Sequence, residues 1–223
     1  ELHYPLGDAV PAVGTTIEVV PGVRWLRMGL PFALDHINLW LLRDQQDGIE
    51  GWTLVDCGIT NDATRAAWEQ VFAEQLNGLP VLRVIVTHMH PDHIGLAHWL
   101  TERWQCRLWI SATDYNGARL ASQSTTGFGG ERSAAFFASH GLTDPEALAK
   151  VRARSNYYAG MVPNVPQAFR RLLDGMVVDV GGHAWRCIVG YGHAPEHMAL
   201  HCAALDLLIS GDMVLPRIST NVS

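Results

Sequence analysis

Residues 87–95, THMHPDHIG, constrain the fold of this chain more than any other segment. They follow the apolar run VLRVIV, which is typical of a β-strand buried on both faces. In α/β proteins, functional groups gather where such strands end and the chain turns. Pro91 fixes φ in this turn, and Asp92 stands where a carboxylate would favour the start of a helix. The segment therefore predicts a strand, a turn rich in polar groups and a helix.

Four side chains of this turn can bind a metal ion: His88, His90, Asp92 and His93. Imidazole nitrogens with a carboxylate oxygen suit zinc, and also iron or manganese. A lone histidine is usually a surface residue or a satisfied core residue. Four such residues at fixed positions would arise by chance in about one chain in a thousand of this length. The cluster therefore predicts a metal site.

Two more polar side chains follow apolar strands later in the chain. His193 comes after WRCIVG, and Asp212 comes after LLISG. Taken singly, the histidine reads as a loop residue and the aspartate as a turn or capping residue. A catalytic metal needs ligands from several strands that meet at one edge, so we expect both to join the first cluster.

The order of elements predicts an α/β protein. Helical spacing marks residues 60–76 and the segment after His93, whereas residues 112–172 form an expected helical insert that frames the mouth of the pocket. Within the insert, 134–141, 145–161 and 163–173 read as helices and the glycine-rich 127–130 as a mobile flap. Hairpin turns are expected at Gly181-Gly182 and at 204–206. β-like runs fill 16–20, 23–30, 37–42, 52–56, 81–87, 107–110, 176–180, 183–190, 198–204 and 205–212.

Composition narrows the functional class. The net charge of −6 argues against a nucleic-acid partner, because proteins that bind nucleic acids usually carry a basic surface. No apolar run approaches the roughly 18 residues of a membrane span. The 4 cysteines are far apart and read as free thiols in a reducing compartment. With no signal peptide at the start, we expect one cytoplasmic domain over residues 1–223 that acts on a small molecule, in an oligomeric state that the sequence leaves open.

The combined motifs resemble the metallo-β-lactamase-fold hydrolase superfamily. They are HMHPDH at 88–93, GHAP at 192–195 and SGD at 210–212, with VDCG at 55–58 upstream. The resemblance implies an αβ/βα sandwich with a metal site at one edge. It also implies that Asp56 orients a metal ligand without binding the metal, although a plain turn aspartate is the alternative. The implied ligands are His88, His90 and His193 for a first ion, Asp92 and His93 for a second, and Asp212 as the bridge between them.

The chain departs from the family pattern in two places. The family continues past the bridging aspartate with more strands, a helix and another histidine ligand, whereas no histidine follows His201 here. We expect that the C-terminal strands and helix are missing from this chain, with a true single-metal site as the alternative. Glu196 also stands where many relatives have glycine. Glu196 and His197 either assist the site or simply form a turn and the start of a strand.

The resemblance implies a hydrolase in which a metal-bound hydroxide attacks a small ester, thioester or lactone. Zinc, as two ions, is the expected cofactor, with iron or manganese as alternatives, and Asp92 is the expected catalytic residue that orients the hydroxide or moves its proton. An aspartate at position 212 resembles the glyoxalase II-like branch rather than true β-lactamases. The alternatives are a mononuclear iron oxygenase similar to persulfide dioxygenases, a phosphodiesterase, and a regulatory metal-binding domain without catalysis.

Overall fold

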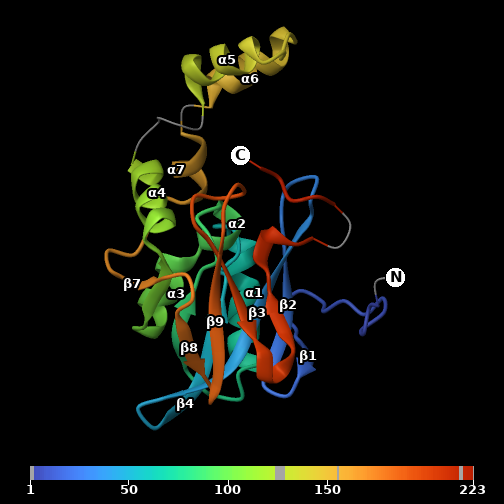
Figure 1. Cartoon of the computed structure of the whole chain (residues 1–223), viewed down its shortest axis with the longest axis vertical. Helices are drawn as coiled ribbons and strands as arrows, with labels where there is room; N and C mark the ends of the chain where they lie inside the picture. Colours follow the sequence, from blue (N-terminus) through green and yellow to red (C-terminus); the bar gives the residue numbers. More distant parts are fainter. Residues whose placement is uncertain (1–2, 124–128, 155, 216–217, 223) are drawn as a thin grey trace.

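The computed structural model of the chain describes residues 3–123, 129–154, 156–215 and 218–222. Two β-sheets face each other, and helices cover the outer face of the larger sheet (Figure 1). This arrangement confirms the predicted α/β class.

The larger sheet has seven strands in the order of the sequence, β1 to β7. Neighbours from β1 to β4 are antiparallel, whereas β4 to β7 run parallel. The carboxyl ends of β4, β5 and β6 therefore share one edge. The strands are β1 (Ile17–Val20), β2 (Val23–Gly29), β3 (His36–Gln46), β4 (Ile49–Val55), β5 (Val81–Ile85), β6 (Arg107–Ser111) and β7 (Phe169–Leu172).

The smaller sheet is antiparallel, in the order β11-β10-β9-β8. The predicted hairpin at Gly181-Gly182 is confirmed, since this pair joins β8 to β9 with φ of 60° and 79°. Two positive φ values suit a type I′ turn, which glycine adopts without strain. The elements are β8 (Val177–Val180), β9 (His183–Gly190), β10 (His197–Cys202), the short helix η1 (Ala203–Leu205), β11 (Leu207–Ile209) and the short helix η2 (Gly211–Met213).

Helix α1 begins after Asn61, whose side chain accepts a hydrogen bond from the backbone of Thr64. Helices α5 and α6 form a hairpin that extends beyond α4 and α7, away from the sheets (Figure 1). None of the helices in the described ranges has both the length and the apolar character needed to cross a bilayer. The helices are α1 (Asp62–Glu74), α2 (Pro91–Ile94), α3 (Ala97–Trp104), α4 (Ala112–Gln123), α5 (Gly130–Ser139), α6 (Pro145–Ala153) and α7 (Tyr157–Met161).

The hydrophobic core has two parts, one on each face of the larger sheet. Between the sheets, the inward side chains of β9 alternate with exposed ones, so that Trp185 and Cys187 are buried while Arg186 faces solvent. Between the larger sheet and the helices, Trp68 of α1 packs with residues of the buried strands, including Leu39 and Leu54. Both cores support the edge on which the polar turns lie.

The expected helix at 163–173 is wrong, because this segment contains strand β7, which pairs in parallel with β6. The aromatic ring of Phe169 stacks on Tyr115 with 3.9 Å between centroids. The guanidinium of Arg170 lies 4.5 Å from the ring centroid of Trp109. Pairing with an open sheet edge and these two contacts outweigh the local helical pattern.

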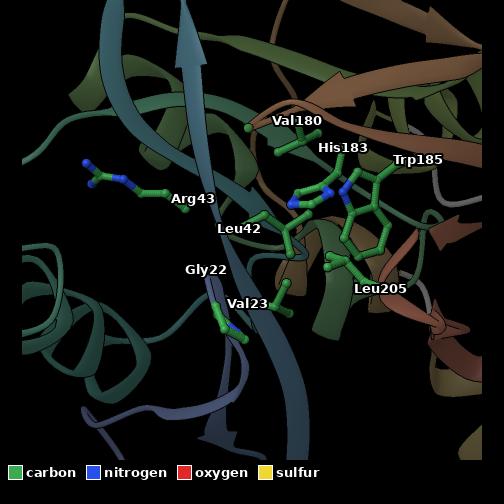
Figure 2. A pocket seen from close by; sticks show the side chains of 10 residues that line it. Gly22, Val23, Leu42, Arg43, Val180, His183, Trp185 and Leu205 are labelled. Atoms are coloured by element: carbon green, nitrogen blue, oxygen red, sulfur yellow. The ribbon is translucent and has the colours of Figure 1, made fainter. Parts of the chain in front are cut away.

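A buried carboxylate joins the two sheets at the end away from the polar turns. Asp44 of β3 accepts hydrogen bonds from Arg83 of β5 (2.8 Å) and from the backbone N–H of Gly181 (3.0 Å). Beside it, a hollow of about 140 Å³ lies between β3 and the β8–β9 hairpin. Figure 2 shows Trp185 and His183 directed from β9 towards Leu42 and Leu205 at this hollow.

Candidate metal centre

The predicted ligands of the 88–93 segment lie at the carboxyl end of β5. His88 is in the turn after this strand, and His90 immediately precedes α2. Asp92 and His93 lie within α2 itself. The predicted order of strand, polar turn and helix is thus confirmed, although the first helix is a single short turn.

Three imidazole nitrogens converge on one point. Nε2 of His88 lies 3.0 Å from Nδ1 of His90 and 3.1 Å from Nε2 of His193. Nδ1 of His90 lies 3.0 Å from Nε2 of His193. His88 and His193 are buried, whereas His90 is partly exposed at the open side of the group. The structure therefore brings together the three residues expected to hold a first ion.

Asp212 lies between this triangle and His93. One carboxylate oxygen of Asp212 is 3.3 Å from Nε2 of His193, and the other is 3.4 Å from Nε2 of His93. Asp92 also approaches this nitrogen, with an oxygen 3.7 Å from Nε2 of His93. The residues expected around a second ion are thus neighbours, in a looser arrangement than the nitrogen triangle.

Hydrogen bonds fix the orientation of two imidazole rings. Nδ1 of His93 lies 2.8 Å from the buried carboxylate of Asp56, which leaves Nε2 towards Asp92 and Asp212. Nδ1 of His193 lies 2.8 Å from the backbone oxygen of Asn221, which accepts its proton and leaves Nε2 towards the triangle. Such contacts hold the ring proton on Nδ1 and leave the lone pair of Nε2 available to bind a metal ion. Sequence reasoning identified Asp56, but no motif pointed to Asn221.

Asp56 has a second role in shaping the site. Its carboxylate accepts hydrogen bonds from the backbone N–H of Thr87 (2.8 Å) and from the Thr87 hydroxyl (2.9 Å). Asp56 itself adopts a left-handed conformation with φ of 65° directly after β4. One carboxylate thereby joins the ends of β4 and β5 and aims His93.

Burial and neighbouring charges divide the histidines into two groups. Burial, reinforced by neighbouring imidazoles, holds the pKa of His88 well below its usual value and lowers the pKa of His90 to about 4. Burial would also lower the pKa of His93, but Asp56 and Asp92 outweigh it and raise that pKa well above its usual value. Against the same effect of burial, Asp212 raises the pKa of His193. Two histidines are thus neutral at pH 7, and two attract protons.

This donor set fits a divalent metal ion. Ligand nitrogens at 2.0–2.1 Å from a tetrahedral ion lie about 3.3 Å apart, close to the spacing of the triangle. The buried Nε2 of His93 has no hydrogen-bond partner among the described residues, although two carboxylates lie nearby. A cation between these groups would satisfy the orphaned nitrogen and neutralise the carboxylates.

Sequence reasoning left open Glu196 and His197, and the structure places both beside the site. His197 is fully buried, and its Nε2 accepts a hydrogen bond from the backbone N–H of Asp212 (3.2 Å). The Glu196 carboxylate points the other way, towards the backbone N–H of Thr113 (3.1 Å). His197 thus supports the segment of Asp212, whereas Glu196 contacts the start of α4.

Asp114 is a residue that sequence reasoning missed. It is fully buried just after β6 and accepts hydrogen bonds from the backbone N–H groups of Met89 (2.8 Å) and Glu196 (2.7 Å). The signal that could have found it is the one that identified Asp56, since both aspartates follow parallel strands of one sheet.

Cys57 follows Asp56 in the chain and is fully buried. Burial raises the pKa of the Cys57 thiol well above its usual value, so this thiol is no candidate nucleophile.

Two helices of the insert contact the turn that carries His88 and His90: the hydroxyl of Tyr158 in α7 donates to the backbone oxygen of Met89 (2.5 Å), and Asp114 in α4 accepts from the backbone N–H of Met89 (2.8 Å). The expected flap begins outside the described residues, which resume at Gly129. Within the described part of the insert, neither α5 nor α6 takes part in the site. Within the described insert, the helices that contact the turn of His88 and His90 are therefore α4 and α7, which lie nearer to the sheets than α5 and α6 (Figure 1).

The family model for the metallo-beta-lactamase superfamily matches residues 33–223. The chain belongs to the metallo-β-lactamase superfamily. This match spans every candidate ligand and confirms the resemblance carried by the motifs. The fold agrees as well, with sheets and helices arranged as in solved members of the superfamily.

Similar proteins carry related descriptions. A β-lactamase domain protein from Burkholderia ambifaria is 57% identical, with a TM-score of 0.89 over 99% of this chain and 62% of that one. A metallo-β-lactamase family protein from Thermus thermophilus is 29% identical, with a TM-score of 0.73 over 92% of this chain and 64% of that one. The probable metallo-hydrolase YqjP of Bacillus subtilis (strain 168) is 24% identical over 88% of this chain and 58% of its own length. The chain thus spans less than two thirds of each of these relatives.

Proposed function

We propose that this chain carries the catalytic centre of a metal-dependent hydrolase that holds two divalent ions, with zinc as the expected metal. The observation that carries the proposal is the position of Asp212. Its two carboxylate oxygens lie 3.3 Å from His193 and 3.4 Å from His93. A carboxylate that offers one oxygen to each of two ligand groups suits a bridge between neighbouring ions.

In this proposal each side chain has a defined task. His88, His90 and His193 hold the first ion, while His93 and Asp92 hold the second, with Asp212 shared. When bound, such ions lower the pKa of a water and polarise a carbonyl oxygen. Asp92 is the only ligand carboxylate besides Asp212 in this set, and we assign it to orient the attacking water and accept its proton.

We further propose that the substrate is a small ester, thioester or lactone. The aspartate at position 212 supports this substrate class, because an aspartate at this position resembles the glyoxalase II-like branch of the superfamily. The net charge of −6 disfavours nucleic acids, because a polyanion is bound through basic surfaces. The partner of this site is therefore a small molecule, and a phosphodiester is the alternative to test alongside it.

A second candidate is a mononuclear iron oxygenase, which one observation favours. The nitrogens of the first group lie within 3.1 Å of one another, whereas Asp92 is 3.7 Å from Nε2 of His93. The compact group could hold one ion while the looser group held none. A protein solved in a di-iron-bound form shares this fold, with 23% identity and a TM-score of 0.55, so the fold accepts iron.

Elemental analysis of the chain, purified without added metal, tests the proposal. We expect about two zinc ions per chain and cleavage of ester, thioester or lactone substrates that stops when a chelator removes the metal. A phosphodiester in the same panel tests the alternative substrate. One iron per chain with oxygen uptake would favour the oxygenase, and a chain that binds no metal would overturn both candidate functions.

A further inference from the structure

Asp114 makes contacts that its own helix does not require. It lies in the first turn of α4 with its side chain fully buried. Its Oδ1 accepts a hydrogen bond from the backbone N–H of Met89 (2.8 Å). Its Oδ2 accepts from the backbone N–H of Glu196 (2.7 Å) and from the hydroxyl of Ser111 (3.1 Å). Ser111 directly precedes α4 and also accepts from the backbone N–H of Asp114 (3.3 Å), so this pair belongs to the start of the helix. Met89 and Glu196 lie outside the helix and its cap, so helix capping does not explain the two bonds from their backbone N–H groups.

The two backbone donors lie in the two loops that carry the nitrogen triangle. Met89 stands between His88 and His90 in the chain, and Glu196 follows His193 by three residues. These loops are far apart in sequence, since His90 and His193 are separated by 103 residues. The two oxygens of one carboxylate therefore set the distance between the loops.

We propose that Asp114 is a positioning residue for the metal centre, which holds the loop of His88 and His90 in register with the loop of His193. The inference rests on the proposed metal-binding function and assigns a residue to it that contacts neither ion. Removal of Asp114 leaves the buried N–H group of Met89 and the partly buried N–H group of Glu196 without this acceptor, and lets the loops move apart. Partners that orient metal ligands affect metal affinity by about 10–100-fold.

Both oxygens are needed because both face N–H groups. An asparagine at this position keeps one oxygen and turns its NH₂ group towards the other backbone N–H, so one of the two loops loses its anchor. Tyr158 offers a partial comparison, because its hydroxyl donates to the backbone oxygen of Met89 in the first loop. We expect zinc affinity to be highest in wild type, lower in Tyr158→Phe and Asp114→Asn, and lowest in Asp114→Ala.

The test measures zinc affinity by competition with a chromophoric chelator, and ligand geometry by the visible absorption spectrum of the cobalt-substituted protein. Circular dichroism checks that each variant is folded. We expect Asp114→Ala to bind zinc about 10–100-fold more weakly than wild type and to show an altered cobalt spectrum. We expect a smaller loss in Asp114→Asn, which still decides the question if the alanine variant does not fold.

Asp44→Asn is the matched control. Asp44 is also a buried aspartate that accepts a backbone N–H from the other sheet, but it lies at the opposite end of the sandwich. This variant should unfold at lower denaturant concentration and bind zinc with unchanged affinity. If wild type binds zinc and both Asp114 variants bind it equally well with an unchanged cobalt spectrum, the positioning role is wrong while the proposed function stands. If wild type itself binds no metal, the proposed function fails and the positioning role fails with it.

Discussion

The carboxylate of Asp56 lies 2.8 Å from Nδ1 of His93, and this contact sets which ring nitrogen faces the metal site. We predict that Asp56→Asn lowers the affinity of the second ion by about tenfold or more. The asparagine oxygen can still accept from the backbone N–H of Thr87, so its NH₂ group would face Nδ1. That contact would move the proton of His93 to Nε2 and block the ligand position.

Metal content after dialysis checks this prediction, with a fall from about two ions towards one per chain expected in the variant. Asp47→Asn is a suitable control, because Asp47 also has a positive φ of 51° but is exposed in the β3–β4 turn. Unchanged metal content in Asp56→Asn would show that the aspartate contributes only to the fold.

Asp212→Ala should abolish hydrolysis while the fold stays intact. Asp212 is partly exposed on η2 and contacts histidines rather than the hydrophobic core, so little packing is lost. Turnover and the denaturant midpoint, measured on the same preparation, separate the two effects. Turnover at the wild-type rate would remove Asp212 from the mechanism.

Metal binding should release protons near pH 7. The pKa values of His93 and His193 are raised by Asp56 and Asp212 against the effect of burial, so both rings tend to be protonated in the metal-free chain. A metal ion displaces these protons, and affinity therefore rises with pH. Calorimetric titration of zinc in buffers of different ionisation enthalpy should show about one to two protons released per chain. A binding enthalpy that is the same in every buffer would contradict this.

Arg83→Met should destabilise the chain by about 3–5 kcal/mol at pH 7, because it leaves the buried Asp44 carboxylate without its cation. Burial alone would raise the pKa of Asp44, but hydrogen bonds from Thr53, Gln46 and Arg83 outweigh it and hold the pKa below its usual value. A depressed folded-state pKa gives stability that is complete above about pH 4 and is lost as the pH falls through the folded-state value. In the variant, the folded-state pKa of Asp44 rises, so the deficit in stability relative to wild type should be largest at pH 7 and should shrink as the pH falls and Asp44 becomes protonated.

Urea unfolding between pH 7 and pH 4 measures this effect. Arg43→Met is the matched control, because Arg43 pairs with Glu50 at the surface, where such pairs contribute about 0–1 kcal/mol. Equal losses of unfolding free energy in the two variants would mean that the buried pair of Arg83 and Asp44 contributes no more to stability than the surface pair.

Gly211→Ala should destabilise the chain more than Gly182→Ala. Both glycines have positive φ, 50° and 79°, and alanine there costs about 1–2 kcal/mol. A side chain at Gly211 would also collide with the buried ring of His197, whereas a side chain at Gly182 would meet open space. Unfolding free energies decide the order, and only Gly211→Ala should also weaken zinc binding, because it displaces the segment of Asp212.

The candidate ligands could be predicted from the sequence because each group follows an apolar strand. These strands are β5 of the larger sheet and β9 and β11 of the smaller sheet, where β9 and β11 run in the same direction on either side of β10. The strand β7 could not, because its conformation depends on pairing with β6 and on the contact of Phe169 with Tyr115, which local patterning does not encode. Asn221 and Asp114 were missed for a related reason. One acts through a backbone oxygen, and the other contacts backbone groups of two distant loops.

The wide sequence separation of the nitrogen triangle has a consequence for how the chain folds. His90 and His193 are 103 residues apart, so the triangle can close only after a large loop has been closed and the second sheet has formed. A metal ion that binds only the closed triangle stabilises the native state by mass action without assisting the earlier steps. Metal should therefore slow unfolding far more than it accelerates refolding, so that depletion of the ion shortens the lifetime of the folded chain.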